Sequence, residues 1–245
     1  MKRILLEVAY DGTNYHGWQI QPNANTIESE LNKALCHLTG EEIHVIGASR
    51  TDSGVHALCN LAVFNTTSRI PAEKFSYALN QGLPEDIRIR NAREVEANFH
   101  PRKCHSIKTY RYSILNTAFA IPTQRHYSYF YHYPLNVELM VQGASYLEGE
   151  HDFIAFSNRR TQAESTIRTI YSIQIEKKQD TIELVVKGSG FLYNMVRLIA
   201  GTLIQVGRGY YLPEYVKEIL EGCERGKAGP VAPAKGLTLV SYEFV

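Results

Sequence analysis

The two halves of this chain carry a similar order of strand-like and helix-like patterns. Apolar runs bounded by turn residues indicate strands, and apolar residues such as Ile27, Leu31 and Leu35 recur at helical spacing. In residues 1–100 the predicted order is strand, helix, strand, strand, helix, strand, at 3–10, 27–38, 42–48, 57–66, 73–83 and 86–95.

The second half repeats this style. Its predicted strands are 106–116, 166–178, 181–188 and 236–245, and its predicted helices are 137–147, 191–206 (closed by Gly207) and 212–223. Strands and helices in this mixed order predict an α+β fold in which sheets pack against helices. We expect two tandem lobes, residues 1–104 and residues 105–245.

Composition restricts the class of protein. Hydrophobic residues make up 44% and charged residues 21%, as in soluble globular chains. No run approaches the ~18 apolar residues of a membrane span, and we expect no signal peptide. The four cysteines form no C-x-x-C pair, which favours reduced thiols in the cytoplasm. The net charge of +1 means that any basic surface must come from local clustering.

The loop GASRTDSGVHALCN (47–60) joins two ordinary strands with more functional groups than a turn needs. Asp52-Ser53-Gly54 is good turn chemistry, since Asp tolerates turn dihedrals. Loops held by a rigid sheet are also where catalytic groups tend to lie. Asp52 is thus either a turn residue or part of a reaction centre. No H-E-x-x-H motif or cysteine pair supports a metal site, and no phosphate-binding glycine loop is complete.

Arg197 is the one charged residue between Lys187 and Arg208. The predicted helix around it is apolar on nearly every face, so we expect it to be buried. An Arg cannot lose its charge, and a buried unpaired one would cost several kcal/mol. We therefore expect a buried ion pair, a guanidinium that reaches water, or a bound anion.

Tyr110 lies in the strand pattern KTYRY, where Lys108, Tyr110 and Tyr112 share one face. Such a tyrosine can pack in a half-buried sheet or form a platform for a nucleobase. Basic clusters beside tyrosines would suit an RNA-contacting surface. The clusters are Arg88, Arg90 and Arg93; Arg102 and Lys103; Arg159 and Arg160.

Five motifs together resemble the bacterial tRNA pseudouridine synthase A family nearly end to end. They are YDGTNYHGWQ (10–19), ASRTDSGVHA (48–57), KTYRY (108–112), GSGFLYNMVRLIAGTL (188–203) and APAKGLTL (232–239). The resemblance implies two ferredoxin-like, RRM-like lobes with antiparallel or mixed sheets that meet at a central catalytic cleft. It also implies isomerisation of uridine to pseudouridine at positions 38, 39 and 40 of the tRNA anticodon stem-loop.

The resemblance further implies a role for four residues. Asp52 would be the catalytic aspartate, and Tyr110 would pack against the target uracil. Arg197 would pair with the aspartate, and Arg50 would fill the place of the flipped nucleotide. No metal or organic cofactor is expected, and a homodimer is implied, with one tRNA contacting both subunits. Two alternatives stay open: a non-catalytic RNA-binding protein, and a nucleoside-processing enzyme with an aspartate nucleophile.

Overall fold

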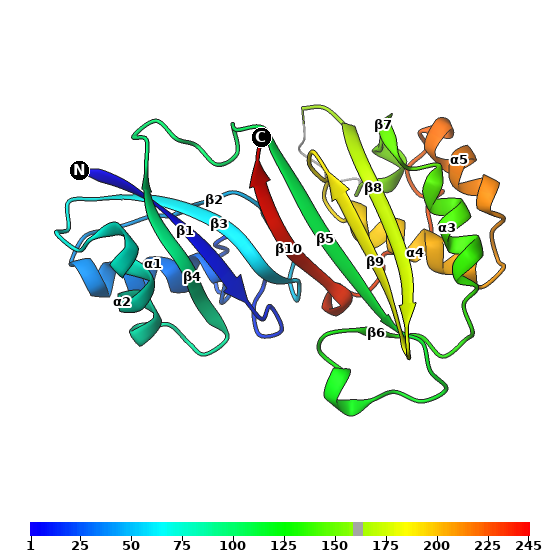
Figure 1. Cartoon of the computed structure of the whole chain (residues 1–245), viewed down its shortest axis with the longest axis horizontal. Helices are drawn as coiled ribbons and strands as arrows, with labels where there is room; N and C mark the ends of the chain where they lie inside the picture. The colour runs from blue at the N-terminus through cyan, green and yellow to red at the C-terminus, as the bar shows by residue number, and fades with distance from the viewer. Residues whose placement is uncertain (159–163) are drawn as a thin grey trace. The chain divides into compact units, whose positions relative to one another are not determined.

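The computed structural model describes residues 1–158 and 164–245, which form two compact units. The first comprises Met1–His105 with Leu239–Val245, and the second comprises Ser106–Thr238. Each unit contains strands and helices, so the α+β prediction is confirmed (Figure 1). The predicted basic pair Arg159 and Arg160 lies outside the described residues.

The first unit is a ferredoxin-like arrangement. Its elements are β1 (Lys2–Tyr10), α1 (Ile27–Thr39), β2 (Ile46–Gly47), β3 (His56–Thr66), η1 (Ala72–Lys74), α2 (Phe75–Gly82) and β4 (Ile87–Val95). The strand order begins β4-β1-β3, and β2 also pairs with β3, off the main path of the sheet; the β4–β1, β1–β3 and β3–β2 pairs are all antiparallel. A βαββαβ chain with this strand order has the split βαβ topology. The expected lobe architecture therefore holds for this unit.

Both faces of this sheet are covered. On the helix side Phe64 of β3 meets Phe75 of α2 edge to face, with ring centroids 5.3 Å apart. On the other side Leu5 and Val63 pack with Tyr242 from the end of the chain. The Tyr242 hydroxyl donates to the Pro101 carbonyl at 2.9 Å. The last seven residues thus pack in the first unit, whereas the predicted lobes assign them to the second half.

One local prediction beside α1 needs correction. The strand predicted over 42–48 is reduced to β2, because the Val45 amide donates to the Asn32 side chain at 2.9 Å instead of to a strand. Helix α1 itself begins after Thr26, whose side chain forms a capping box with Ser29. Apolar alternation fixed which side chains are buried but not which backbone groups pair.

The second unit has a four-stranded antiparallel sheet in the order β5-β9-β8-β7, with β6 parallel to β5. Its elements are β5 (Ser106–Leu115), η2 (Pro122–Gln124), β6 (Tyr129–Phe130), α3 (Val137–Ser145), β7 (Gly149–Asp152), η3 (Ile154–Phe156), β8 (Ile167–Lys178), β9 (Thr181–Gly188), α4 (Met195–Gly207), α5 (Pro213–Gly222) and η4 (Ala234–Gly236). The last strand, β10 (Leu237–Phe244), begins in this unit.

Helix α4 is the most buried helix of this unit, as its sequence predicted. Eleven of its residues are buried, and the partly exposed exceptions are Arg197 and Gln205. The helix begins at Met195 rather than at the predicted residue 191, because Asn194 adopts a left-handed conformation (φ 63°). In the described residues no helix is long and apolar enough to cross a membrane.

Candidate active site

Asp52 lies at the start of a tight turn between β2 and β3. Its carbonyl accepts the Val55 amide at 3.1 Å, and Gly54 takes the positive φ (77°) that the turn requires. The turn interpretation of Asp-Ser-Gly is therefore confirmed. The side chain of Asp52 is nevertheless partly exposed, while Thr51 and Val55 beside it are buried. A turn with buried neighbours on both sides presents one carboxylate in a fixed place.

The loop 11–25 braces this turn through its backbone. The Trp18 amide donates to the Thr51 carbonyl at 3.0 Å, and the Gly54 amide donates to the Tyr15 carbonyl at 3.3 Å. Gly17 has φ 91°, and a Cβ there would lie 2.6 Å from the Thr51 carbonyl oxygen. No side chain fits at that separation, so this glycine permits the close approach of the two loops.

A buried polar network holds the segment before Asp52. The Tyr10 hydroxyl lies 2.7 Å from the Thr51 hydroxyl and accepts from the Asn60 amide at 3.2 Å. That same amide donates to the Ser49 carbonyl at 3.0 Å. Burial raises the pKa of the Tyr10 phenol well above its usual range, so it stays protonated. Ser49 and Thr51 are thus fixed on either side of Arg50.

His56 ties the same two loops together. It is 5% exposed, and its Nδ1 lies 3.1 Å from the Asp11 carboxylate and accepts the Gly12 amide at 3.1 Å. A buried histidine held by loop atoms has a structural explanation. No cluster of three metal-ligating side chains occurs among the described residues.

Arg50 is exposed beside a second cation. The Arg102 guanidinium donates through Nε to the Gly47 carbonyl at 2.7 Å, which places it against the start of the same loop. Burial, and then the charge of Arg50, lower the pKa of Arg102. Two guanidinium groups beside the loop that carries Asp52 make a local positive surface on a chain whose net charge is only +1. Such a surface suits phosphate groups.

Tyr110 occupies the middle of β5 in the second unit, opposite Val186 of β9. It is 8% exposed, and its ring meets the Phe191 ring edge to face at 5.2 Å and 85°. Tyr110 is therefore buried and packs within the sheet, and its contact with a nucleobase stays a prediction. No pattern in the sequence indicated Phe191. It reaches Tyr110 because the chain turns back between β9 and α4.

Arg197 is fixed by main-chain and amide groups of its own unit. Its Nε donates to the Ala232 carbonyl at 2.7 Å, and a terminal nitrogen donates to the Asn194 side chain at 3.0 Å. The Ala232 amide donates back to the Arg197 carbonyl at 3.2 Å. The side chain is half-buried, so these bonds aim a guanidinium out of the buried helix.

The C-terminal motif APAKGLTL holds both α4 and β5 in place. The Tyr112 hydroxyl donates to the Pro233 carbonyl at 2.8 Å, and a Cβ on Gly236 would lie 2.7 Å from the Tyr112 ring. Ala232 of the motif bonds to Arg197 of α4, and just before the motif the Gly229 amide donates to the Thr202 hydroxyl at 2.9 Å. The three motifs of the second half are therefore one packed group, a relation that sequence spacing does not reveal.

Comparisons with known proteins identify the family of the chain. The model of the tRNA pseudouridine synthase family matches residues 7–102 and 144–245. The chain belongs to that family. It is 51% identical over 244 residues to the tRNA pseudouridine synthase A of Thermoanaerobacter sp. (strain X514), with 100% of both chains covered. It is 50% identical over 245 residues to that of Ruminiclostridium cellulolyticum, again with 100% of both covered. Identity to that of Brevibacillus brevis is 46% over 239 residues, with 98% of both covered.

Family membership confirms the resemblance but not the roles of single residues. Asp52 and Arg50 lie in the first unit, and Tyr110 and Arg197 lie in the second. The pairing of Asp52 with Arg197 therefore stays a prediction. Sequence reasoning did not identify the groups that position these residues. The chief ones are Gly17, which lies against the turn of Asp52, and the Ala232 carbonyl, which accepts from Arg197. Glycines inside a loop motif were the available signal.

Proposed function

We propose that this chain isomerises uridine to pseudouridine at positions 38, 39 and 40 of the tRNA anticodon stem-loop. In this reaction the N1–C1′ bond breaks, the uracil turns, a C5–C1′ bond forms, the C5 proton is lost to water and N1 takes up a proton. One proton leaves and one enters, so no further reactant is needed to balance these steps. The observation that carries the proposal is the rigidly braced Asp52 turn in a member of the tRNA pseudouridine synthase family.

Asp52 acts on the target nucleotide in this proposal, either as a nucleophile at C1′ or as a base on the sugar. A carboxylate is suited to covalent sugar-transfer chemistry. Both roles need an ionised group in a fixed position, and the hydrogen bonds at Thr51 and Gly54 supply that rigidity. Arg197 pairs with Asp52 in the proposal, keeps it ionised and aims it.

Tyr110 packs against the target uracil, and the edge contact from Phe191 sets the plane of its ring. A paired uridine must leave the stem first, at a cost of about a few kcal/mol of unstacking. Arg50 enters the space that the flipped nucleotide leaves. Its exposure and the neighbouring charge of Arg102 support that role, because both favour contact with the phosphate backbone.

We further propose a cytoplasmic homodimer in which one tRNA contacts both subunits. Two copies would combine basic residues that one nearly neutral chain cannot gather alone. Light scattering on a sizing column at micromolar concentration tests this state. A dimer mass is expected, and a monomer mass would contradict the proposal.

The function itself is tested with tRNA transcripts that carry tritium at C5 of uridine. Release of tritium to water is expected when a uridine stands at position 38, 39 or 40, and none is expected when all three are cytidine. Binding without release would reduce the protein to an RNA-binding module. Release from free uridine as fast as from tRNA would favour a nucleoside-processing enzyme.

A further inference from the structure

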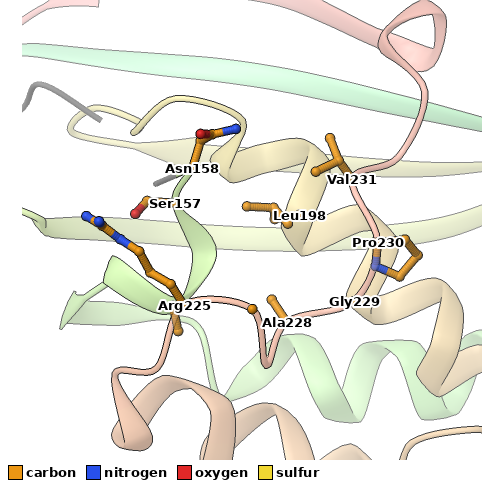
Figure 2. A pocket seen from close by; sticks show the side chains of 10 residues that line it. Ser157, Asn158, Leu198, Arg225, Ala228, Gly229, Pro230 and Val231 are labelled. Atoms are coloured by element: carbon orange, nitrogen blue, oxygen red, sulfur yellow. The ribbon is translucent and has the colours of Figure 1, made fainter. Parts of the chain in front are cut away.

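A cavity of about 470 Å³ opens in the second unit, apart from the four predicted site residues. Figure 2 shows it between the turn after η3, helix α4 and the connection that leads to η4. In this view Leu198, Pro230 and Val231 lie on one side, and Ser157, Asn158 and Arg225 lie on the other. The cavity therefore has an apolar side and a polar side.

Arg225 supplies the only charge among the residues that line the cavity, all of which belong to the described part of the chain. Its Nε is buried and has no hydrogen-bond partner within the described residues. Leaving such a donor unsatisfied is costly, and an Arg cannot lose its charge. The neighbouring Glu224 faces Lys227 instead, 3.8 Å away. A ligand with an anionic acceptor would give the Arg225 guanidinium the hydrogen-bond partner that Nε lacks in the described residues.

The polar side adds little that could replace that ligand. The Ser157 hydroxyl already donates to the Ile154 carbonyl at 2.8 Å, so its oxygen is left as an acceptor. Asn158 adds a neutral side-chain amide, so Arg225 is the one cationic donor among the lining residues. A fork of N–H groups on a planar cation matches phosphate oxygens better than it matches a neutral group.

The apolar side indicates what accompanies the anion. Small-molecule sites of about 300–1,000 Å³ combine apolar walls with a few placed polar groups. Unstacked bases of single-stranded RNA pack on flat side-chain surfaces while nearby cations hold the phosphate. We propose that this cavity binds one unstacked nucleotide of the tRNA substrate, with its base against Leu198, Pro230 and Val231 and its phosphate on Arg225.

This subsite rests on the proposed function. Its walls include residues next to Arg197 and next to Ala232, the two residues joined by a hydrogen bond. Leu198 follows Arg197 in α4, and Val231 precedes Ala232, whose carbonyl accepts from Arg197. A nucleotide in the cavity therefore packs on both segments that fix the Arg197 guanidinium. The subsite binds a nucleotide other than the one that reacts.

The test is the equilibrium binding of fluorescein-labelled tRNA, measured by anisotropy. Arg225→Gln removes the charge, Arg225→Lys keeps the charge without the fork, and Val231→Phe fills the apolar side. Lys227→Gln is the matched control, because it removes a nearby exposed cation that does not line the cavity. We expect Arg225→Gln and Val231→Phe to raise the Kd about tenfold, Arg225→Lys less, and Lys227→Gln less than about twofold.

Three further readings exclude a purely structural role for Arg225. The slope of log K against log salt concentration should fall by about one phosphate contact in Arg225→Gln. The urea midpoint and the kcat at saturating tRNA should stay at wild-type values, so that the defect appears in KM. A lower urea midpoint with an unchanged salt slope would overturn the proposal, as would wild-type Kd values in both Arg225→Gln and Val231→Phe.

The source of the phosphate is settled by a competition arm with uridine 5′-monophosphate and inorganic phosphate. Arg225-dependent binding of the free mononucleotide, with tRNA affinity unaffected by Arg225→Gln, would replace the RNA subsite by a mononucleotide site. Arg225-dependent tRNA binding without tritium release would refute the proposed function and leave the subsite standing. Tritium release by the wild type, with tRNA affinities unchanged in the variants, would support the proposed function and refute the subsite.

Discussion

Asp52 and Arg197 are both held by backbone atoms, but by different kinds of structure. The Asp52 turn is braced by a second loop, whose approach requires a glycine at position 17. Arg197 projects from a buried helix, and a hydrogen bond to the Ala232 carbonyl fixes its guanidinium. One group depends on two loops that almost touch, and the other depends on a packed core.

This difference predicts different responses to substitution. Loops make few apolar contacts, so a change in the bracing loop should displace Asp52 while the fold survives. A close-packed helix transmits strain, so a change beside α4 should reduce stability and activity together. The ratio of lost activity to lost stability is therefore the quantity that separates the two regions.

Apart from replacement of Asp52 itself, the largest effect on activity is expected from Arg197→Met. Loss of the cation removes charge stabilisation worth about 10²–10³ in kcat/KM. If Arg197 keeps Asp52 ionised, the acidic limb of the kcat/KM profile should move to higher pH, because removing a nearby cation raises a carboxyl pKa. The measurement is tritium release between pH 5 and pH 8.

Two companions sharpen this result. Arg197→Lys keeps the charge but loses the Nε donor to Ala232, so we expect about a tenfold loss. Arg208→Met, at the exposed C-terminal end of α4, should leave kcat/KM at the wild-type value. An unshifted acidic limb in Arg197→Met would argue against the pairing with Asp52.

A smaller effect is expected from Gly17→Ala. The new Cβ would lie 2.6 Å from the Thr51 carbonyl and would occupy a backbone with φ 91°. The bracing loop must move, and a displacement of about 1 Å at a reactive group can cost about 10² in rate. Tritium release and urea unfolding measured on the same preparation test whether activity falls more than stability does.

Gly40→Ala is the matched control for backbone strain. Gly40 has φ 72° at the end of α1, and a Cβ there meets nothing within 4 Å. We expect the backbone strain alone to lower stability by about 1 kcal/mol and to leave kcat at the wild-type value. Equal losses of activity in the two variants would mean that general destabilisation, not the position of the Asp52 turn, explains the defect.

The smallest effects should come from deleting single hydroxyl groups. Tyr10→Phe leaves the Thr51 hydroxyl without its partner in the network before Asp52, at a cost of about 1–3 kcal/mol. Tyr112→Phe removes one bond to Pro233, at about 0.5–1.5 kcal/mol. Urea unfolding gives both stabilities, and only Tyr10→Phe should also lower kcat severalfold. An equal fall of kcat in Tyr112→Phe would contradict the distinction.

The sequence predicted the elements well, because apolar periodicity depends on the side chains themselves. The burial of α4 follows directly from a run in which Arg197 is the one charge. The strand predicted at 42–48 was too long, because the Val45 amide donates to the side-chain oxygen of Asn32 and not to a neighbouring strand. Side-chain competition for backbone groups leaves no periodic signal.

The site was predictable only in part. Asp52, Arg50, Tyr110 and Arg197 could be named from motifs, since their residue types stand out in loops or apolar runs. What holds them could not, because contacts such as Gly17 with Thr51 join segments more than thirty residues apart. The same holds for the Arg225 cavity, whose walls come from three separate stretches of chain.

The most direct test of the account is tritium release by Asp52→Asn, measured beside tRNA binding. Asn keeps the size of the side chain but cannot act as a nucleophile or a base at that position. Asp180→Asn, in the exposed β8–β9 turn, is the control and should keep full activity. We predict that Asp52→Asn loses at least about 10³-fold in release while its Kd for tRNA stays within about threefold. Release near the wild-type rate, or binding lost in step with activity, would contradict the assignment of Asp52 as the reaction centre.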